Sequence, residues 1–223
     1  MRDTSDSRAD FLASTYAHFL GAIAAFIAIE IALFRSGRAV VLAERMLSVN
    51  WLWVLGAYIL VSFVFGYLAH HMSARWLQYV GLAGGVGSLA LLFVPLLFQA
   101  ERIAPRTIET AALVSVLGFC ALTVAVFWSR HDFSFLAPFL SFFGLFALGL
   151  IVYACLFGVH LGLWFSSGMI LLAVASVLYD TSEVLLHFDD GEHVAAALEL
   201  FTSLGLLFWY AVRWAAEWVS DRD

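Results

Sequence analysis

The longest stretch without Asp, Glu, Lys or Arg covers 47 residues, from 133 to 179. A helix needs about 20 mostly apolar residues to cross the hydrocarbon core of a bilayer, so this stretch is long enough for two spanning helices. The whole chain is 63% hydrophobic and only 13% charged, whereas a soluble domain is about 25% charged. A soluble domain of this size exposes too much surface to hide such a composition. The sequence therefore predicts an integral membrane protein.

Counting the charge-poor stretches predicts seven transmembrane helices. They cover residues 11–29 (continuing through Glu30 to 34), 51–69, 76–100, 110–129, two helices within 133–179 separated near 158–162, and a last one from about 193 to 214. Open sheet edges cannot face lipid, so we expect an all-α fold. The helices form a single domain over 11–218, with a polar tail at 1–10 and a short tail at 219–223. The connection at 36–50 contains AVVLAERML, which is typical of a short interfacial helix.

Several functional classes are excluded by the same composition. The net charge is −6 and no basic run is present, so nucleic-acid binding has no electrostatic support. All eleven positive charges are arginines, which excludes chemistry that needs a lysine, such as a retinal Schiff base. The sequence has no HxxxH, HExxH or GxSxG motif. We therefore expect no enzyme activity, no cofactor, and the lipid bilayer as a partner.

Four acids lie within the predicted spans, and such groups are functional candidates because each costs about 2.5–3.5 kcal/mol at a helix centre on insertion scales. They are Glu30, Asp180, Glu183 and Glu199. Glu30 stands five residues before Arg35 near a helix end, which predicts an interfacial acid paired with an arginine. His70 and His71 close the second span, and we expect both in the head-group layer.

The segment LYDTSEVLLHF places Asp180 and Glu183 on one helix face, because they are three residues apart. Glu199 and Ser203 share a face of the next helix for the same reason. Two antiparallel neighbours joined by a short loop would bring Asp180 near Glu199 or Ser203. One interpretation is that Asp180 and Thr181 satisfy a helix end, with Glu183 and His187 in water. The other is a carboxylate cluster that titrates or takes up a hard cation, with Asp180 and Glu199 as a candidate calcium or proton site.

Four segments resemble the Bax inhibitor-1 family, with its bacterial YccA-like branch the nearest. They are RHDFSFLAPFL from Arg130, LYDTSEVLLHFDDGEHVAAALELF, TYAHFLGAIAAF at 15–26 and WLQYVGLAG at 76–84. The resemblance implies a bundle of six helices around a central seventh, in the bacterial inner membrane, with the N-terminus inside. Arginine counting points the other way, with four on the N-terminal side and seven opposite. We follow the family.

The resemblance also implies a pH-sensitive calcium leak controlled by two aspartates on the sixth and seventh helices. Asp180 matches the first aspartate, but Ser203 stands at the second, and Glu199 one turn earlier is its candidate replacement. The arginine that latches onto the first aspartate has no clear match, and His70, His71 and Arg75 are the nearest basic groups. The residues predicted to sense pH or to gate are therefore Asp180, Glu183, Glu199, Ser203, His71 and Arg75.

The serine at position 203 also keeps a second function open. A like-charge pair raises the pKa of one carboxyl and makes a proton switch, and a serine cannot form such a pair. The YccA-like branch carries a serine at this position too. The resemblance therefore implies, as the alternative, a non-conducting regulator of a membrane-bound AAA protease of the FtsH type.

Overall fold

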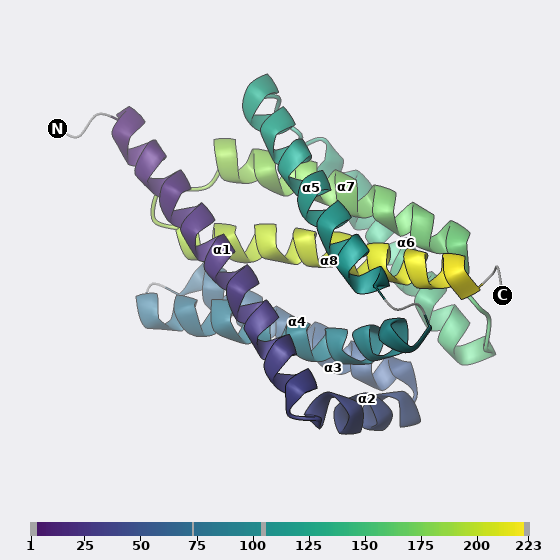
Figure 1. Ribbon diagram of the computed structural model, residues 1–223. Coiled ribbons are helices and arrows are strands. Elements are labelled where there is room, and N and C mark those ends of the chain that lie inside the picture. The colour runs from purple at the N-terminus through teal and green to yellow at the C-terminus, as the bar shows by residue number, and fades with distance from the viewer. Residues whose placement is uncertain (1–3, 73, 104–105, 221–223) are drawn as a thin grey trace.

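A computed structural model describes residues 4–72, 74–103 and 106–220, and in these ranges the chain is helical with no strand (Figure 1). The helices are α1 (Thr4–Arg35), α2 (Arg38–Ser48), α3 (Trp51–His71), α4 (Arg75–Ile103), α5 (Thr107–Ser129), α6 (Leu136–Phe157), α7 (Leu163–Leu186) and α8 (His193–Ser220). All except α2 are long and apolar enough to cross a membrane, which makes seven. The predicted all-α bundle of seven transmembrane helices is confirmed.

The helix boundaries agree with the predicted ones in most places. The break expected at 158–162 is present, because Gly158 ends α6 with a φ of 67°, a left-handed conformation that favours glycine. The helix expected within 36–50 is α2. The bundle helices extend further than predicted at both ends of the chain. Residues 4–10 of the expected polar tail are the first turns of α1, and α8 continues past 214 to Ser220.

Helix α8 lies at the centre of the bundle and packs against α1, α3, α4, α5 and α7 (Figure 1). In the most apolar window of α8, 61% of the residues are buried, against 6% in α3 and in α6. Small residues make this central position possible, since Ala195, Ala196 and Ala197 take up little space between neighbouring helices. Helix α6 packs on α7 and α3 at the periphery. The resemblance implied such a central helix.

Glycines on α4 allow it to approach its two main neighbours. A Cβ added to Gly81 would lie 2.6 Å from the backbone nitrogen of Ala69 on α3. A Cβ added to Gly85 would lie 2.7 Å from a methyl carbon of Leu198 on α8. The small-residue segment at 81–88 was predicted to allow close helix contact, and α4 uses it on both sides.

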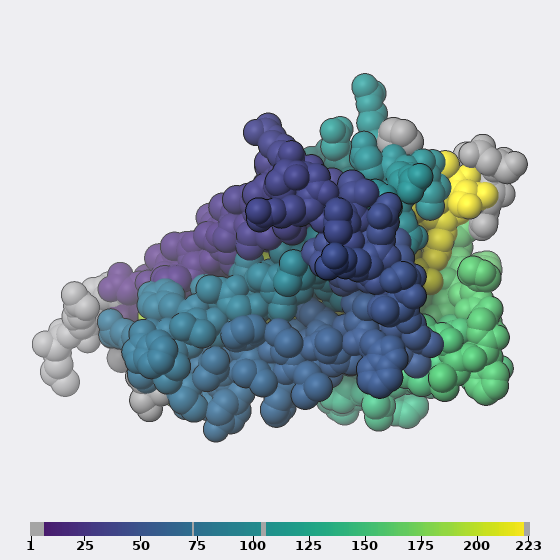
Figure 2. Space-filling model, turned by 90° about the horizontal axis from the view of Figure 1, so that it is seen from below, coloured from purple at the N-terminus to yellow at the C-terminus, as the bar shows by residue number. Residues whose placement is uncertain are grey.

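The outer helices present large apolar side chains to their surroundings. On α3, Trp53 is 78% exposed and Phe63 is 72% exposed. Figure 2 shows the face of the molecule over which α2, α3 and α4 lie. Side chains of this kind are stable on the outside of a bundle when lipid surrounds it, so this face is suited to the hydrocarbon core.

Candidate functional site

Asp180 is held between α7 and α8 by two serine hydroxyl groups. Ser203 of α8 donates a hydrogen bond to Oδ2 of Asp180, and Ser176 donates to the same oxygen at 3.2 Å. The two serine oxygens are themselves 3.2 Å apart. Ser176 lies four residues before Asp180 and so shares its helix face. The sequence predicted that Asp180 would lie near Glu199 or Ser203, and the structure pairs it with Ser203. Ser176 was not predicted, although its spacing from Asp180 is visible in the sequence.

Glu199 is bonded to a histidine of a third helix. Nε2 of His70, at the end of α3, lies 2.9 Å from Oε1 of Glu199. Nδ1 of the same ring lies 2.9 Å from the carbonyl oxygen of Gly66, and a carbonyl oxygen can only accept, so Nδ1 carries a proton. The contact between Nε2 and Oε1 then needs a second proton, held by the imidazole or by the carboxyl. His70 and Glu199 therefore share a proton across the gap between α3 and α8.

A series of polar contacts joins the loop between α5 and α6 to α7 at the same end of the bundle. Glu183 and His187 form an i,i+4 pair with 3.6 Å between Oε2 and Nδ1, and His187 Nε2 lies 3.5 Å from Oδ2 of Asp132. The backbone N–H of Phe133 donates to the Ser182 hydroxyl at 3.2 Å. The RHDFSF segment between α5 and α6 thus attaches to the end of α7. The N–H of Ser134, 2.8 Å from Oδ1 of Asp132, lowers the pKa of the Asp132 carboxyl, as do the Ser134 hydroxyl and nearby His187.

Arg8 fastens the start of α1 to the end of α7. Its guanidinium donates to the carbonyl oxygens of Val184 at 2.7 Å and Phe188 at 2.5 Å. It also lies 3.5 Å from a carboxyl oxygen of Asp190. The last carbonyls of a helix have no partner within the helix, so an arginine satisfies them well. This role of Arg8 was not predicted from the sequence, because Arg8 lies in the segment 1–10 that was expected to be a polar tail.

Two of the predicted gating residues lie apart from Asp180. His71 is exposed and its ring stacks on Tyr67, with the ring centroids 4.7 Å apart. Arg75 is the exposed first residue of α4. Glu199 bonds to His70 rather than to Arg75. His71 and His70 are neighbours in the chain but point to different partners, since successive residues differ by about 100° around a helix.

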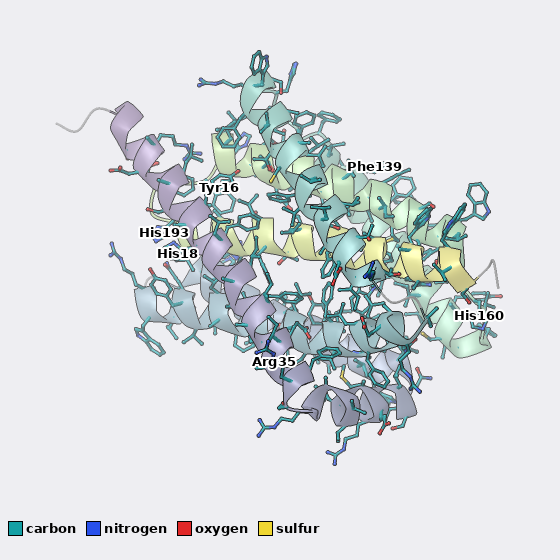
Figure 3. All side chains as sticks on the ribbon, viewed as in Figure 1. Tyr16, His18, Arg35, Phe139, His160 and His193 are labelled. Carbon is teal, nitrogen blue, oxygen red and sulfur yellow. The ribbon has the colours of Figure 1, made fainter. Side chains whose placement is uncertain are left out.

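A cavity of about 350 Å³ runs along α8, and its lining residues include neither Asp180 nor the two serines that hold it. Thr202 lines it on α8, and it continues between α3, α4, α6 and α8 to His160 and Arg213. His160 lies at the opposite end of the bundle from His18 and His193 (Figure 3). Arg213 is held there by Glu217 at 2.8 Å and by the carbonyl oxygen of Leu161 at 2.6 Å. The cavity thus connects the middle of α8 with the far end of the molecule.

The acids of α7 and α8 do not converge into a closed cage. Over the described ranges, no group of three or more His, Cys, Asp or Glu side chains is placed to hold a metal ion. Asp180 and Glu199 instead have separate partners: Asp180 contacts Ser203 of α8, and Glu199 of α8 contacts His70 of α3. Fold and site together define a multi-pass helical membrane protein whose last two helices carry partly buried acids.

A family model described as "Inhibitor of apoptosis-promoting Bax1" matches residues 8–216. The chain belongs to this family, the Bax inhibitor-1 family, as the resemblance indicated.

Its curated relatives include Protein LIFEGUARD 1 of Arabidopsis thaliana, 34% identical in an alignment of 110 residues that covers 45% of this chain and 45% of its own. Protein LIFEGUARD 3 of the same plant is 32% identical over 56% of this chain and 52% of its own. An uncharacterized protein of Pseudomonas aeruginosa is 30% identical over 45% of this chain and 46% of its own. The matched parts span about half the length of these relatives. No solved structure matches this chain.

Proposed function

We propose that this protein is a pH-sensitive leak channel for calcium and related cations in the bacterial inner membrane. The observation that carries the proposal is the Asp180 carboxyl group, held by Ser203 and Ser176 inside the helix bundle. An ionisable group in a transmembrane helix is costly and commonly marks an ion or proton pathway. Glu199 lies one turn before Ser203 on α8 and adds a second carboxyl group toward the end of α3, where His70 contacts it.

The proposed pathway follows oxygen-bearing side chains along α7 and α8. Calcium is a hard cation that prefers carboxylate, hydroxyl and carbonyl oxygens. It would pass Glu183 and Glu199 and reach Asp180 and the two serines. Calcium is the transported ion in this scheme and has no resident site.

Protons compete for the same groups, which is the proposed origin of the pH sensitivity. An ionised Asp180 accepts hydrogen bonds from Ser203 and Ser176, whereas a protonated one becomes a donor and must rearrange this contact. The proton shared by His70 and Glu199 links α3 to α8 in the same way. Both contacts therefore change with pH, and both join helices that flank the pathway.

The test is calcium flux into proteoliposomes, measured with a trapped indicator from pH 5 to pH 8. Asp180→Asn keeps the shape of the side chain and removes the charge, so we expect flux or its pH response to fall by about tenfold, equivalent to about 1.4 kcal/mol. Asp189→Asn is the matched control, because this acid is exposed in the α7–α8 loop. Wild-type flux in Asp180→Asn at every pH would reduce Asp180 to a structural residue.

The second candidate function is a non-conducting regulator that binds a membrane-bound AAA protease. Ser203 favours it, because the second aspartate of a paired-carboxylate switch is missing at this position. The two functions are separated by a pull-down from membranes combined with the flux measurement. Recovery of the protease by a protein that supports no ion flux would favour the regulator.

A further inference from the structure

Glu30 is a buried acid that the Asp180 cluster does not use. The residue is only 7% exposed, and neither carboxyl oxygen has a hydrogen-bond partner within the described ranges. The predicted pairing with Arg35 is wrong. Five residues turn an α-helix by about 500°, so the two side chains point about 140° apart. Arg35 lies exposed at the end of α1 (Figure 3).

The Glu30 side chain lines a cavity of about 240 Å³ between α1, α4, α5 and α8. Apart from Glu30 and Ser115, the residues lining this cavity are apolar or glycine. The Ser115 hydroxyl is also buried without a hydrogen-bond partner among the described residues. Two unpartnered polar groups thus line one apolar chamber, which we call the Glu30 cavity.

The Glu30 cavity opens sideways, between α1 and α5. Three residues of its wall are well exposed on the outside of the bundle: Ile27 (49%), Ile31 (47%) and Val116 (44%). Nearer the start of α1 this gap is closed by Phe19 and Phe119, whose stacked rings are 5.0 Å apart. Since α1 and α5 are both spanning helices, the opening faces the bilayer. A ligand that enters here must dissolve in lipid.

The polar residues that line the Glu30 cavity determine which head group such a ligand should carry. An ionised carboxylate without a partner in apolar surroundings costs several kcal/mol. A cationic head group would supply the missing partner, and an ammonium has three N–H donors to share between a carboxylate and a hydroxyl oxygen. A neutral alcohol would gain much less from a carboxylate. The apolar walls suit an alkyl chain.

We propose that the Glu30 cavity binds a lipophilic primary amine from the bilayer. The ammonium group pairs with the Glu30 carboxylate and donates to the Ser115 hydroxyl oxygen, while the alkyl chain leaves between Ile27 and Val116. This site is separate from the Asp180 cluster, which lies between α7 and α8. It is therefore independent of the proposed ion leak.

Dodecylamine and dodecanol form the test pair, because they share a chain and differ in the charge of the head. Their binding to the protein in phosphatidylcholine nanodiscs is titrated by native mass spectrometry. We expect wild type to bind the amine at least tenfold more tightly than the alcohol, and Glu30→Gln to lose this preference. Glu109→Gln is the matched control, since Glu109 is exposed on α5 beside the cavity residue Ile108. Equal affinities for amine and alcohol in wild type would overturn the proposal.

A second measurement needs only wild-type protein, in case Glu30→Gln does not fold. Dicyclohexylcarbodiimide, an apolar reagent, adds as a whole molecule to carboxyl groups in membranes, and peptide mass spectrometry locates the adduct. Saturating dodecylamine should leave Glu30 unmodified, with neither the carbodiimide adduct nor the dodecyl amide that an activated carboxyl would form with the amine, and dodecanol should not protect it. Labelling of Glu30 that is unchanged by saturating dodecylamine would contradict the proposed site.

Discussion

At the scale of single residues, the acids of this protein differ in what partners them. Asp180 has two serine hydroxyl groups, Glu199 has a histidine, and Glu30 has no partner in the described part of the chain. A buried carboxyl without a partner costs more than a paired one. The acid that looked most ordinary in the sequence, close to a helix end and to an arginine, is therefore the least satisfied in the structure.

Position 203 tests the paired-carboxylate switch. Ser203→Asp would place a second carboxyl against Asp180, and two like charges at this distance cannot both ionise easily. We expect the ratio of calcium flux at the two ends of the range pH 5–8 to increase severalfold over wild type. Ser203→Asn, which has a similar shape and no charge, is the control. An unchanged ratio in Ser203→Asp would favour the protease-regulator function.

The pair of His70 and Glu199 predicts coupled effects. Glu199→Gln and His70→Gln each remove one partner of the same shared proton, so each should shift the pH midpoint of flux in the same direction. The double variant should shift it no further, because contacting residues are non-additive. The measurement is calcium flux over pH 5–8 in wild type, the two single variants and the double variant, which together form a double-mutant cycle. Fully additive shifts would show that the 2.9 Å contact has no role in gating.

At the scale of elements, contact between α3 and α4 depends on a missing side chain. Gly81→Ala would place a Cβ 2.6 Å from backbone atoms of Ala69 and Phe65, which cannot move without shifting α3. We expect the free energy of unfolding to fall by about 1–3 kcal/mol. At this chain length each kcal/mol lowers the unfolding temperature by about 2–4 °C. Thermal unfolding in detergent measures it. Gly87→Ala on the same helix has open space at its Cβ and should unfold close to wild type.

The loop between α5 and α6 carries a second prediction, which concerns pH. The N–H of Ser134 lowers the pKa of Asp132 in the folded protein. A carboxyl with a depressed pKa stabilises the fold above its unfolded pKa, and this contribution is lost as pH falls through the folded pKa. Wild type should therefore unfold at a higher temperature than Asp132→Asn at pH 7. The difference should shrink as the pH is lowered below about 4, and a constant difference would contradict it.

At the scale of the whole molecule, an odd number of spanning helices, seven, places the start of α1 and the end of α8 on opposite sides of the membrane. Following the family, we expect the N-terminus inside, so alkaline phosphatase fused after α8 should be active in a bacterial host. The same enzyme fused after α7, with one span fewer, should be inactive and serves as the control. The reverse pattern would support the arginine count instead.

Much of this architecture could be predicted from the chain alone. Hydrocarbon imposes length and polarity on each span, so charge-free runs determined the number of helices, and Gly158 and Gly162 marked the break between α6 and α7. The motif around Asp180 indicated both the family and the approach of Asp180 to Glu199 or Ser203. Each of these features involves a single helix or two helices joined by a short loop, so the spacing of residues along the sequence is enough to predict it.

What only the tertiary structure decided lies between helices far apart in sequence. His70 reaches Glu199 across 129 residues, and Arg8 reaches Val184 across 176. Such contacts depend on which face of each helix turns toward the centre. That rotation is weakly encoded here, because spans that are apolar all round, such as α3, have no polar face to mark it. Glu30 shows the consequence, since its burial depends on how α1 is rotated against α4, α5 and α8 rather than on any neighbour in the sequence.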